Sequence, residues 1–205
     1  HTLCEQDFPP LARTVEVLRP FLDTVAPNLR WLNLGGGHLV THPDYERAAL
    51  AGLLDTLARA YEVQVFLELG TAVACDAGIL VGEVLDVMEN DGHVAVLDVS
   101  ATCHMPDVLE APYRPALRGE RGDAHAVRLA GPSCLAGDVI GTYGFDVLPQ
   151  AGDRLAFLDQ AHYSMVKTTT FNGVPLPALA IWNSDTDALR MVRAFDYADF
   201  EGRLS

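Results

Sequence analysis

The spacing of apolar residues changes near Gly78, and this change limits the possible folds more than any other feature of the sequence. Before that point, expected helices alternate with short buried strands. The helices are expected over 11–24 and after Pro43, and the strands over 31–34 and 63–67. The second helix is expected to place four residues on its apolar face: Tyr45, Ala49, Leu53 and Leu57. Alternating strands and helices are typical of parallel α/β structure.

After Gly78 the sequence indicates short strands separated by turns. Residues 79–87 and 93–99 flank Asn90-Asp91-Gly92 and are expected to form a hairpin. Further strands are expected around 125–129, 153–158, 162–168, 178–182 and 189–194. We therefore expect two units, a parallel α/β unit over residues 1–78 and a mostly antiparallel β domain over 79–205.

The charge balance limits the classes of partner. The 205 residues include 28 Asp and Glu against 14 Lys and Arg, which gives a formal net charge of −14. Because phosphate backbones require a basic face, a nucleic-acid partner is not expected, whereas a cationic small molecule suits the chain. No apolar run is long enough for a membrane span, and the start does not read as a signal peptide. These features predict a soluble, cytoplasmic protein without a membrane partner.

The cysteines do not follow a metal or disulfide pattern. Cys4, Cys75, Cys103 and Cys134 are widely spaced, without a CxxC pair or a histidine at metal-ligand spacing. Neither a zinc site nor a disulfide framework is therefore expected. His1 lies at the start of a segment that already reads as structured, which suggests the C-terminal portion of a longer polypeptide.

Polar groups follow two neighbouring strands in the first unit. Gly35, Gly36 and Gly37 lie directly after an expected strand, where backbone N–H groups can converge on an anion because no Cβ blocks the approach. Glu68 follows the next strand, and in a (β/α)8 barrel the C-terminal ends of the strands form the active face. A tight turn at the glycines and a solvated Glu68 are the alternative interpretations.

Three further polar residues of the second unit are candidates for a site. Residues 131–138 place Cys134 in a loop bounded by glycine and proline. A thiol in a loop can act as an acid or a nucleophile when its neighbours tune its pKa, although most unpaired cysteines are small buried residues. Tyr163 can donate to a phosphate, and Asp107 can bind an ammonium group. For each of them a purely structural role is the alternative.

Six segments together resemble one family. They are HTLCE at 1–5, WLNLGGGH at 31–38, LDVSA at 97–101, HMPD at 104–107, GPSCLAGD at 131–138 and YSMVKTTTFNG at 163–173. These motifs resemble carboxynorspermidine decarboxylase, also called carboxyspermidine decarboxylase, over essentially the whole chain.

This resemblance implies a fold, a cofactor and an assembly. The family belongs to the pyridoxal-phosphate decarboxylases of the alanine racemase-like fold, which work as homodimers. Residues 1–78 are then expected to be the C-terminal part of a (β/α)8 barrel that binds pyridoxal 5'-phosphate. Residues 79–205 are expected to be a mostly antiparallel β domain that contributes substrate and dimer contacts.

The resemblance also implies roles for residues at the cofactor. His1 matches a histidine that stacks on the pyridine ring, and the three glycines match the loop that holds the phosphate. Tyr163 matches a tyrosine that reaches the same phosphate, and Glu68 matches the carboxylate paired with the pyridine nitrogen. Loss of CO2 leaves a carbanion whose electrons the cofactor accepts, and a carboxylate at the ring nitrogen favours the positively charged ring.

Further implied roles concern the substrate. Cys134 matches a cysteine that approaches from the partner subunit and donates a proton to the carbanion. Asp107 and Asp138 lie in segments that face the substrate in relatives, where carboxylates suit its distal amines. The substrate implied is a carboxylated polyamine.

The sequence departs from the family pattern in two places. The family's Glu-Pro-Gly-Glu reads Glu68-Leu69-Gly70-Thr71, so an acidic residue is missing at Thr71. The family's Schiff-base lysine comes from the first barrel strand, upstream of His1, and the single lysine of this chain, Lys167, does not match it. We therefore expect the complete gene product to decarboxylate carboxyspermidine or carboxynorspermidine, and the 205 residues alone not to turn over substrate.

Two alternatives remain open. One is a noncatalytic module of the same fold that binds the cofactor or mediates dimerisation. The other is diaminopimelate decarboxylase or another basic amino-acid decarboxylase. Leu135 counts against the second alternative, because those relatives carry an acid directly after the cysteine.

Overall fold

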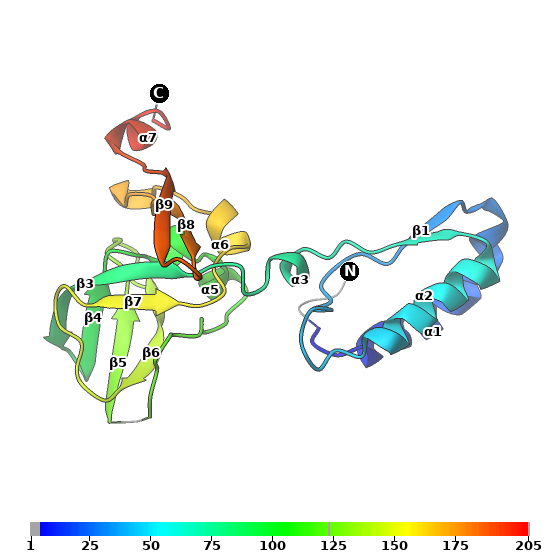
Figure 1. Cartoon of the computed structure of the whole chain (residues 1–205), viewed down its shortest axis with the longest axis horizontal. Helices are drawn as coiled ribbons and strands as arrows, with labels where there is room; N and C mark the ends of the chain where they lie inside the picture. Colours follow the sequence, from blue (N-terminus) through cyan, green and yellow to red (C-terminus); the bar gives the residue numbers. More distant parts are fainter. Residues whose placement is uncertain (1–4, 123, 205) are drawn as a thin grey trace. The chain divides into compact units, whose positions relative to one another are not determined.

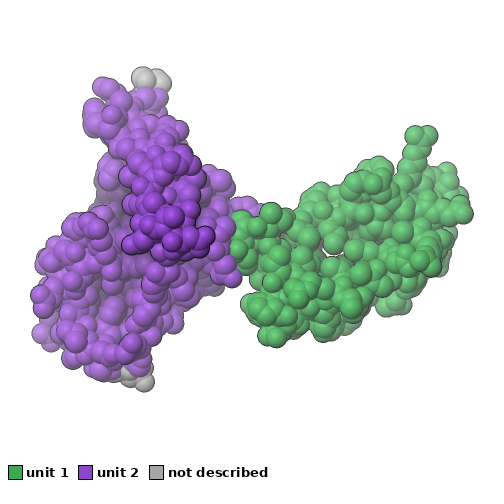
Figure 2. Space-filling model, viewed as in Figure 1, with its two compact units in different colours: residues 1–75 green, residues 76–205 purple. Residues whose placement is uncertain are grey.

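The computed structural model describes residues 5–122 and 124–204. The chain divides into two compact units, unit 1 (His1–Cys75) and unit 2 (Asp76–Ser205), which Figure 2 shows in green and purple. None of the helices within the described ranges is long and apolar enough to cross a membrane.

Unit 1 is built around a parallel pair of strands. Its elements are α1 (Pro9–Val25), the short 3-10 helix η1 (Ala26–Asn28), β1 (Trp31–Asn33), α2 (Arg47–Tyr61), β2 (Gln64–Phe66) and α3 (Thr71–Ala74) (Figure 1). β1 and β2 pair in parallel with Leu32 opposite Val65. Since α2 connects the two strands, the observed order agrees with the predicted parallel α/β pattern.

The two long helices pack through the apolar positions that recur along them. α1 begins at Pro9, where the missing N–H of proline costs no hydrogen bond, and buries Leu11, Val15 and Leu22. α2 buries Leu50 and Leu57. The expected position of Ala49 on the buried face is wrong, since Ala49 is exposed and Tyr45 precedes the helix. The buried face of α2 runs through Leu50 and Leu57, with Leu53 half-buried.

The strands of unit 1 are covered on one face. Leu32 and Val65 pack against the cluster formed by α1 and α2. Trp31 and Phe66 are exposed, so the prediction of two buried strands is wrong for this face. Because side chains alternate along a strand, Asn33 lies on the same face as Trp31. We call this side the open face of unit 1.

Unit 2 contains a five-stranded sheet in the order β6-β5-β4-β3-β7. The strands are β3 (Leu80–Glu89), β4 (His93–Leu97), β5 (His125–Ala130), β6 (Val139–Phe145) and β7 (Arg154–Phe157). β3 and β4 form the predicted hairpin, and its turn places Asp91 and Gly92 at positive φ. The β3–β7 and β5–β6 pairs are also antiparallel.

β4 and β5 pair in parallel, so the sheet is mixed and the expectation of a mostly antiparallel domain holds only in part. Residues 98–124 connect the two strands and include the short helices α4 (Ala101–His104) and α5 (Asp107–Glu110). A connection of this length can return the chain to the start of the neighbouring strand, which a short turn cannot do.

The remaining elements of unit 2 follow the sheet in the sequence. They are α6 (Tyr163–Val166), the 3-10 helix η2 (Phe171–Gly173), the antiparallel strands β8 (Leu179–Asn183) and β9 (Ala188–Arg193), and α7 (Tyr197–Glu201). The strand predicted over 162–168 is wrong, because α6 occupies most of it. The imidazole of His162 accepts a hydrogen bond from the backbone N–H of Tyr163 at 2.8 Å and caps this helical turn.

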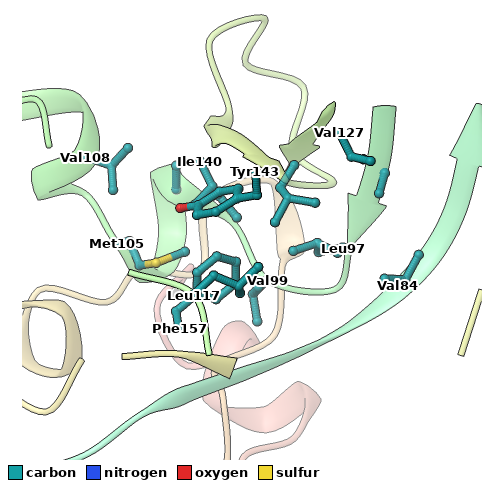
Figure 3. Packing of buried hydrophobic residues seen from close by; sticks show 13 residues of the cluster. Val84, Leu97, Val99, Met105, Val108, Leu117, Val127, Ile140, Tyr143 and Phe157 are labelled. Atoms are coloured by element: carbon teal, nitrogen blue, oxygen red, sulfur yellow. The ribbon is translucent and has the colours of Figure 1, made fainter. Parts of the chain in front are cut away.

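The core of unit 2 joins the sheet to the 98–124 connection (Figure 3). Tyr143 and Phe157 pack edge to face with their ring centroids 6.1 Å apart. The Tyr143 hydroxyl donates to the carbonyl oxygen of Pro115 at 2.8 Å, and burial raises the pKa of Tyr143 to about 12. Met105 and Val108 extend this core to α4 and α5. The packing therefore fixes α4 against the sheet.

Candidate functional site

The glycine loop, Gly35–Gly37, has a backbone that favours glycine. Gly35 has a φ of 75° and Gly37 a φ of 92°, which side-chain-bearing residues rarely adopt. Gly36 is buried between them. The loop thus presents main chain without Cβ atoms directly after β1.

Asn33 joins the glycine loop to Glu68. Its Nδ2 donates to Oε1 of Glu68 at 2.7 Å, and its Oδ1 accepts from the backbone N–H of Gly35 at 2.8 Å. The backbone N–H of Glu68 donates to the carbonyl oxygen of Gly35 at 2.7 Å. The structure therefore brings the glycine loop and Glu68 together at the ends of β1 and β2.

Asn33 was not a candidate from the sequence. The available signal was one polar side chain in an otherwise apolar strand, two residues before the first glycine. Its partner Glu68 is 35 residues further along the chain, and only the parallel pairing of β1 and β2 makes them neighbours.

The other side of the glycine loop contacts the start of the chain. The backbone N–H of Glu5 donates to the carbonyl oxygen of Gly37 at 2.8 Å, and that of Leu39 donates to the carbonyl oxygen of Glu5 at 2.9 Å. His38, only 1% exposed, lies 3.4 Å from the Tyr45 hydroxyl through its Nδ1. Burial lowers the pKa of His38, which favours the neutral imidazole. His1 lies outside the described residues.

In unit 2, the cysteine loop, Gly131–Asp138, presents Cys134 at the surface. The backbone N–H of Cys134 donates to Oδ1 of Asn172 at 2.8 Å. A Cβ on Gly131 would overlap the carboxylate of Asp138, so the start of the loop requires glycine. The loop is thus closely fitted around Asp138.

Asp138 is 3% exposed, and its carboxylate accepts several hydrogen bonds. The donors are the Ser100 hydroxyl at 2.8 Å, the Thr102 N–H at 3.1 Å and the Ser133 N–H at 3.2 Å. Burial acts to raise the pKa of Asp138, but these hydrogen bonds outweigh it and the net pKa is lowered. The hydrogen bonds indicate that Asp138 holds the cysteine loop, and its contact with substrate stays a prediction.

Asp138→Asn is expected to lower the free energy of unfolding by about 1–3 kcal/mol at pH 7, because an amide cannot accept all of these hydrogen bonds. A lowered folded-state pKa stabilises the protein above the unfolded value of about 3.9, and the stabilisation is lost as the pH falls through the folded-state value. Urea unfolding at pH 7 and near pH 3 should therefore show a difference between variant and wild type that shrinks on acidification. An equal difference at both pH values would contradict this role.

Tyr163 and Asp107 belong to two short helices of unit 2, α6 and α5. Tyr163 is half-exposed at the start of α6. Lys167, which follows α6, donates to the carboxylates of Asp107 and Glu110. These two hydrogen bonds raise the pKa of Lys167. We call Asp107, Glu110 and Lys167 the acid–lysine cluster, which carries one net negative charge.

The candidate residues thus form separate groups. Unit 1 holds the glycine loop, Asn33 and Glu68, and unit 2 holds the cysteine loop, Tyr163 and the acid–lysine cluster. Within residues 5–122 and 124–204, no three His, Cys, Asp or Glu side chains gather as a metal site.

A family model matches more than half of the chain. Residues 22–161 match the family model described as pyridoxal-dependent decarboxylase, C-terminal sheet domain, and the chain belongs to this family. The match confirms the resemblance indicated by the sequence motifs.

Two curated relatives resemble the chain over nearly its whole length. The chain is 44% identical to carboxyaminopropylagmatine decarboxylase from Synechocystis, over 100% of this chain and 54% of the relative. It is 37% identical to carboxynorspermidine/carboxyspermidine decarboxylase from Campylobacter jejuni, over 99% of this chain and 56% of the relative. The chain therefore spans about half the length of the curated relatives it matches.

A solved structure shows the same fold. The crystal structure of carboxynorspermidine decarboxylase from Campylobacter jejuni, complexed with norspermidine, superimposes with a TM-score of 0.89 at 37% identity. The match covers 99% of this chain and 59% of that one.

Proposed function

We propose that the protein containing this chain is a pyridoxal 5'-phosphate-dependent carboxy-lyase that converts carboxynorspermidine or carboxyspermidine to norspermidine or spermidine in polyamine biosynthesis. The observation that carries this proposal is the junction of the glycine loop with Glu68 through Asn33. The names of the relatives at 37–44% identity, all decarboxylases of carboxylated polyamines or their agmatine analogue, support it.

The residues of unit 1 fit this cofactor chemically. A loop of glycines with positive φ suits a phosphate, because its main chain can approach closely. Glu68 offers a carboxylate whose Oε1 is already oriented by Asn33, and such a group favours a protonated ring nitrogen. When bound, the cofactor supplies the sink for the electrons left by the departing CO2.

We propose that unit 1 is the C-terminal part of a (β/α)8 barrel and binds the cofactor. The parallel β1–α2–β2 order supports this, and so do the helices that cover only one face of the strands. In such a barrel the inner face of the strands is packed, and the active residues lie at their C-terminal ends. Asn33 and Glu68 occupy these positions.

For unit 2 we propose contacts with the substrate, with the cofactor phosphate and with a second copy of the chain in a cytoplasmic homodimer. Cys134 is the proton donor and reaches the site of the partner subunit. Its exposure at the tip of the cysteine loop supports this role. Tyr163 is half-exposed at the start of α6, and its hydroxyl donates a hydrogen bond to the phosphate.

The substrate proposed is a polycation, and charge supports it. The formal net charge of the chain is −14. The acid–lysine cluster keeps one net negative charge after Lys167 is paired, which leaves Asp107 able to attract a distal ammonium. The second candidate substrate is carboxyaminopropylagmatine, which appears in the name of the relative at 44% identity. It is also a cationic molecule that carries a carboxylate.

Asn33→Ala is expected to weaken binding of pyridoxal 5'-phosphate about tenfold, because it removes two hydrogen bonds that shape the site. Titration of the apoprotein followed by cofactor absorbance or fluorescence measures this. Asn28→Ala, in the exposed turn before β1, serves as the matched control and should leave the affinity unchanged. Equal affinity of Asn33→Ala and wild type would contradict the bridging role.

The proposed function is tested by CO2 release from the holoenzyme that contains this chain. The substrates are carboxynorspermidine, carboxyspermidine, carboxyaminopropylagmatine and meso-diaminopimelate. The proposal predicts the highest kcat/KM for one of the first two. A preference for the agmatine analogue supports the second candidate, and a preference for diaminopimelate or no release at all would overturn the assignment.

A further inference from the structure

Cys134 is held by a residue outside its own loop. The backbone N–H of Cys134 donates to Oδ1 of Asn172 at 2.8 Å, across 38 residues of sequence. Asn172 has a φ of 60° and a ψ of 19°, the left-handed conformation that asparagine tolerates better than most residues. The position therefore suits a residue that combines this backbone with a hydrogen-bonding side chain.

The segment that carries Asn172 is fastened to α4. The carbonyl oxygen of Cys103 accepts from the backbone N–H of Thr169 at 2.9 Å. The Cys103 thiol donates to the carbonyl oxygen of Phe171, with Sγ and oxygen 3.5 Å apart. Both contacts lie within three residues of Asn172, so the main chain on its N-terminal side is fixed.

A buried histidine fastens the other side of the same segment. His104 is 2% exposed, and burial lowers its pKa, which favours the neutral imidazole. Its Nδ1 accepts from the backbone N–H of Ser100 at 3.1 Å, so the ring proton is on Nε2. Nε2 then donates to the carbonyl oxygen of Pro175 at 3.0 Å.

The cysteine loop is attached to α4 as well. Asp138 accepts from the Ser100 hydroxyl and the Thr102 N–H at the start of the helix, and from the Ser133 N–H in the loop. The residue before Cys134 and the N–H of Cys134 itself are thus held by two groups, Asp138 and Asn172. Both groups are fixed to α4, which packs in the core through Ala101 and through Met105 directly after the helix.

We propose that Asn172 is a positioning residue that fixes the main chain of Cys134 and thereby aims its thiol at the reacting carbon. This inference rests on the proposed function, in which Cys134 donates the proton. Proton transfer requires donor and acceptor within hydrogen-bond reach. A mobile cysteine loop would keep the thiol out of reach of the reacting carbon for part of the time, which lowers the rate of this step without changing substrate binding.

Two variants separate the hydrogen bond from the backbone conformation. Asn172→Gly keeps the left-handed backbone at no steric cost and removes the acceptor. Asn172→Asp keeps an oxygen acceptor for the Cys134 N–H. Asn183→Gly is the matched control, because Asn183, the last residue of β8, also accepts backbone hydrogen bonds through Oδ1, from the turn between β8 and β9.

Amide hydrogen exchange of the peptide containing Cys134 gives a readout independent of catalysis. Asn172→Gly should increase exchange at this amide about tenfold, since one hydrogen bond is lost. Asn172→Asp and Asn183→Gly should leave it near wild type. Thermal unfolding of each variant verifies that the fold is retained.

Steady-state kinetics of the holoenzyme complete the test. Asn172→Gly should lower kcat about tenfold with KM unchanged, and Asn172→Asp should recover most of kcat. Unchanged exchange in Asn172→Gly overturns the inference, and so does faster exchange with wild-type kcat or a change confined to KM. Absence of CO2 release from the wild type would instead refute the proposed function, while the exchange data still decide whether Asn172 holds Cys134.

Discussion

Replacing Glu68 with glutamine is expected to lower kcat of the holoenzyme about 100- to 1,000-fold, because a neutral amide no longer favours a positively charged ring at the moment when charge develops. Glutamine has nearly the same shape, and its Oε1 can still accept from Nδ2 of Asn33. The cofactor affinity should therefore change much less than kcat. Initial rates of CO2 release at saturating cofactor, together with a cofactor titration, measure the two effects separately.

The matched control for this variant is Glu62→Gln. Glu62 lies at the C-terminal end of α2 and is exposed, in the same unit as Glu68. It should keep wild-type kcat. If kcat of the Glu68→Gln enzyme were within twofold of the wild-type value, Glu68 would not belong to the site. An equal loss of kcat in both variants would indicate a general effect of charge.

The second large effect is expected at the thiol. Cys134→Ala should lower kcat about 100-fold or more, the usual contribution of a positioned general acid. KM should change little, because the thiol is assigned to proton transfer rather than to binding. Amine and CO2 are both quantified in the first turnover, and the amine is expected to lag behind the CO2 by up to one equivalent of enzyme, since each carbon that lost CO2 requires a proton before the amine is released.

Cys75→Ala is the control for the loss of a thiol, because Cys75 lies in unit 1 directly after α3. It is expected to release amine and CO2 in equal amounts at the wild-type rate. If the Cys134→Ala enzyme also released amine and CO2 in equal amounts at the wild-type rate, another group would have to supply the proton. Asn172 would then not act on the rate by holding Cys134.

The sequence predicted the elements whose pattern is long and periodic. α1 and α2 follow from apolar residues that repeat with the helical period, and the β3–β4 hairpin follows from Asn90-Asp91-Gly92 between two apolar runs. The strand predicted over 162–168 is wrong. Its β-branched residues favour a strand locally, but His162 caps a helical turn there.

The positions of the candidate residues are predictable from the sequence where these residues are contiguous or lie at strand ends. The glycine loop and Glu68 belong to this group, and their positions follow from the parallel order of β1 and β2. The partners of Asp138 and Asp107 did not follow from the sequence. Asp138 bonds Ser100 across 38 residues, and Asp107 pairs with Lys167 across 60, so both contacts depend on tertiary packing.

These partners change the interpretation of the acidic residues. The family resemblance assigns Asp107 and Asp138 to the substrate, yet Asp138 is already enclosed by N–H and O–H donors. Its role in holding the cysteine loop places it in the same network as Asn172. The loop that presents Cys134 is therefore supported from two sides by groups fixed to α4.

The proposed function requires Gly35–Gly37 and Glu68 to hold one pyridoxal 5'-phosphate molecule between them. A crystal structure of the holoenzyme that contains this chain tests it most directly. We expect the phosphate against the glycine loop, the ring nitrogen hydrogen-bonded to Glu68, and Asn33 bridging the loop and Glu68 as it does here. A cofactor bound elsewhere, or a ring nitrogen with no contact to Glu68, would contradict it.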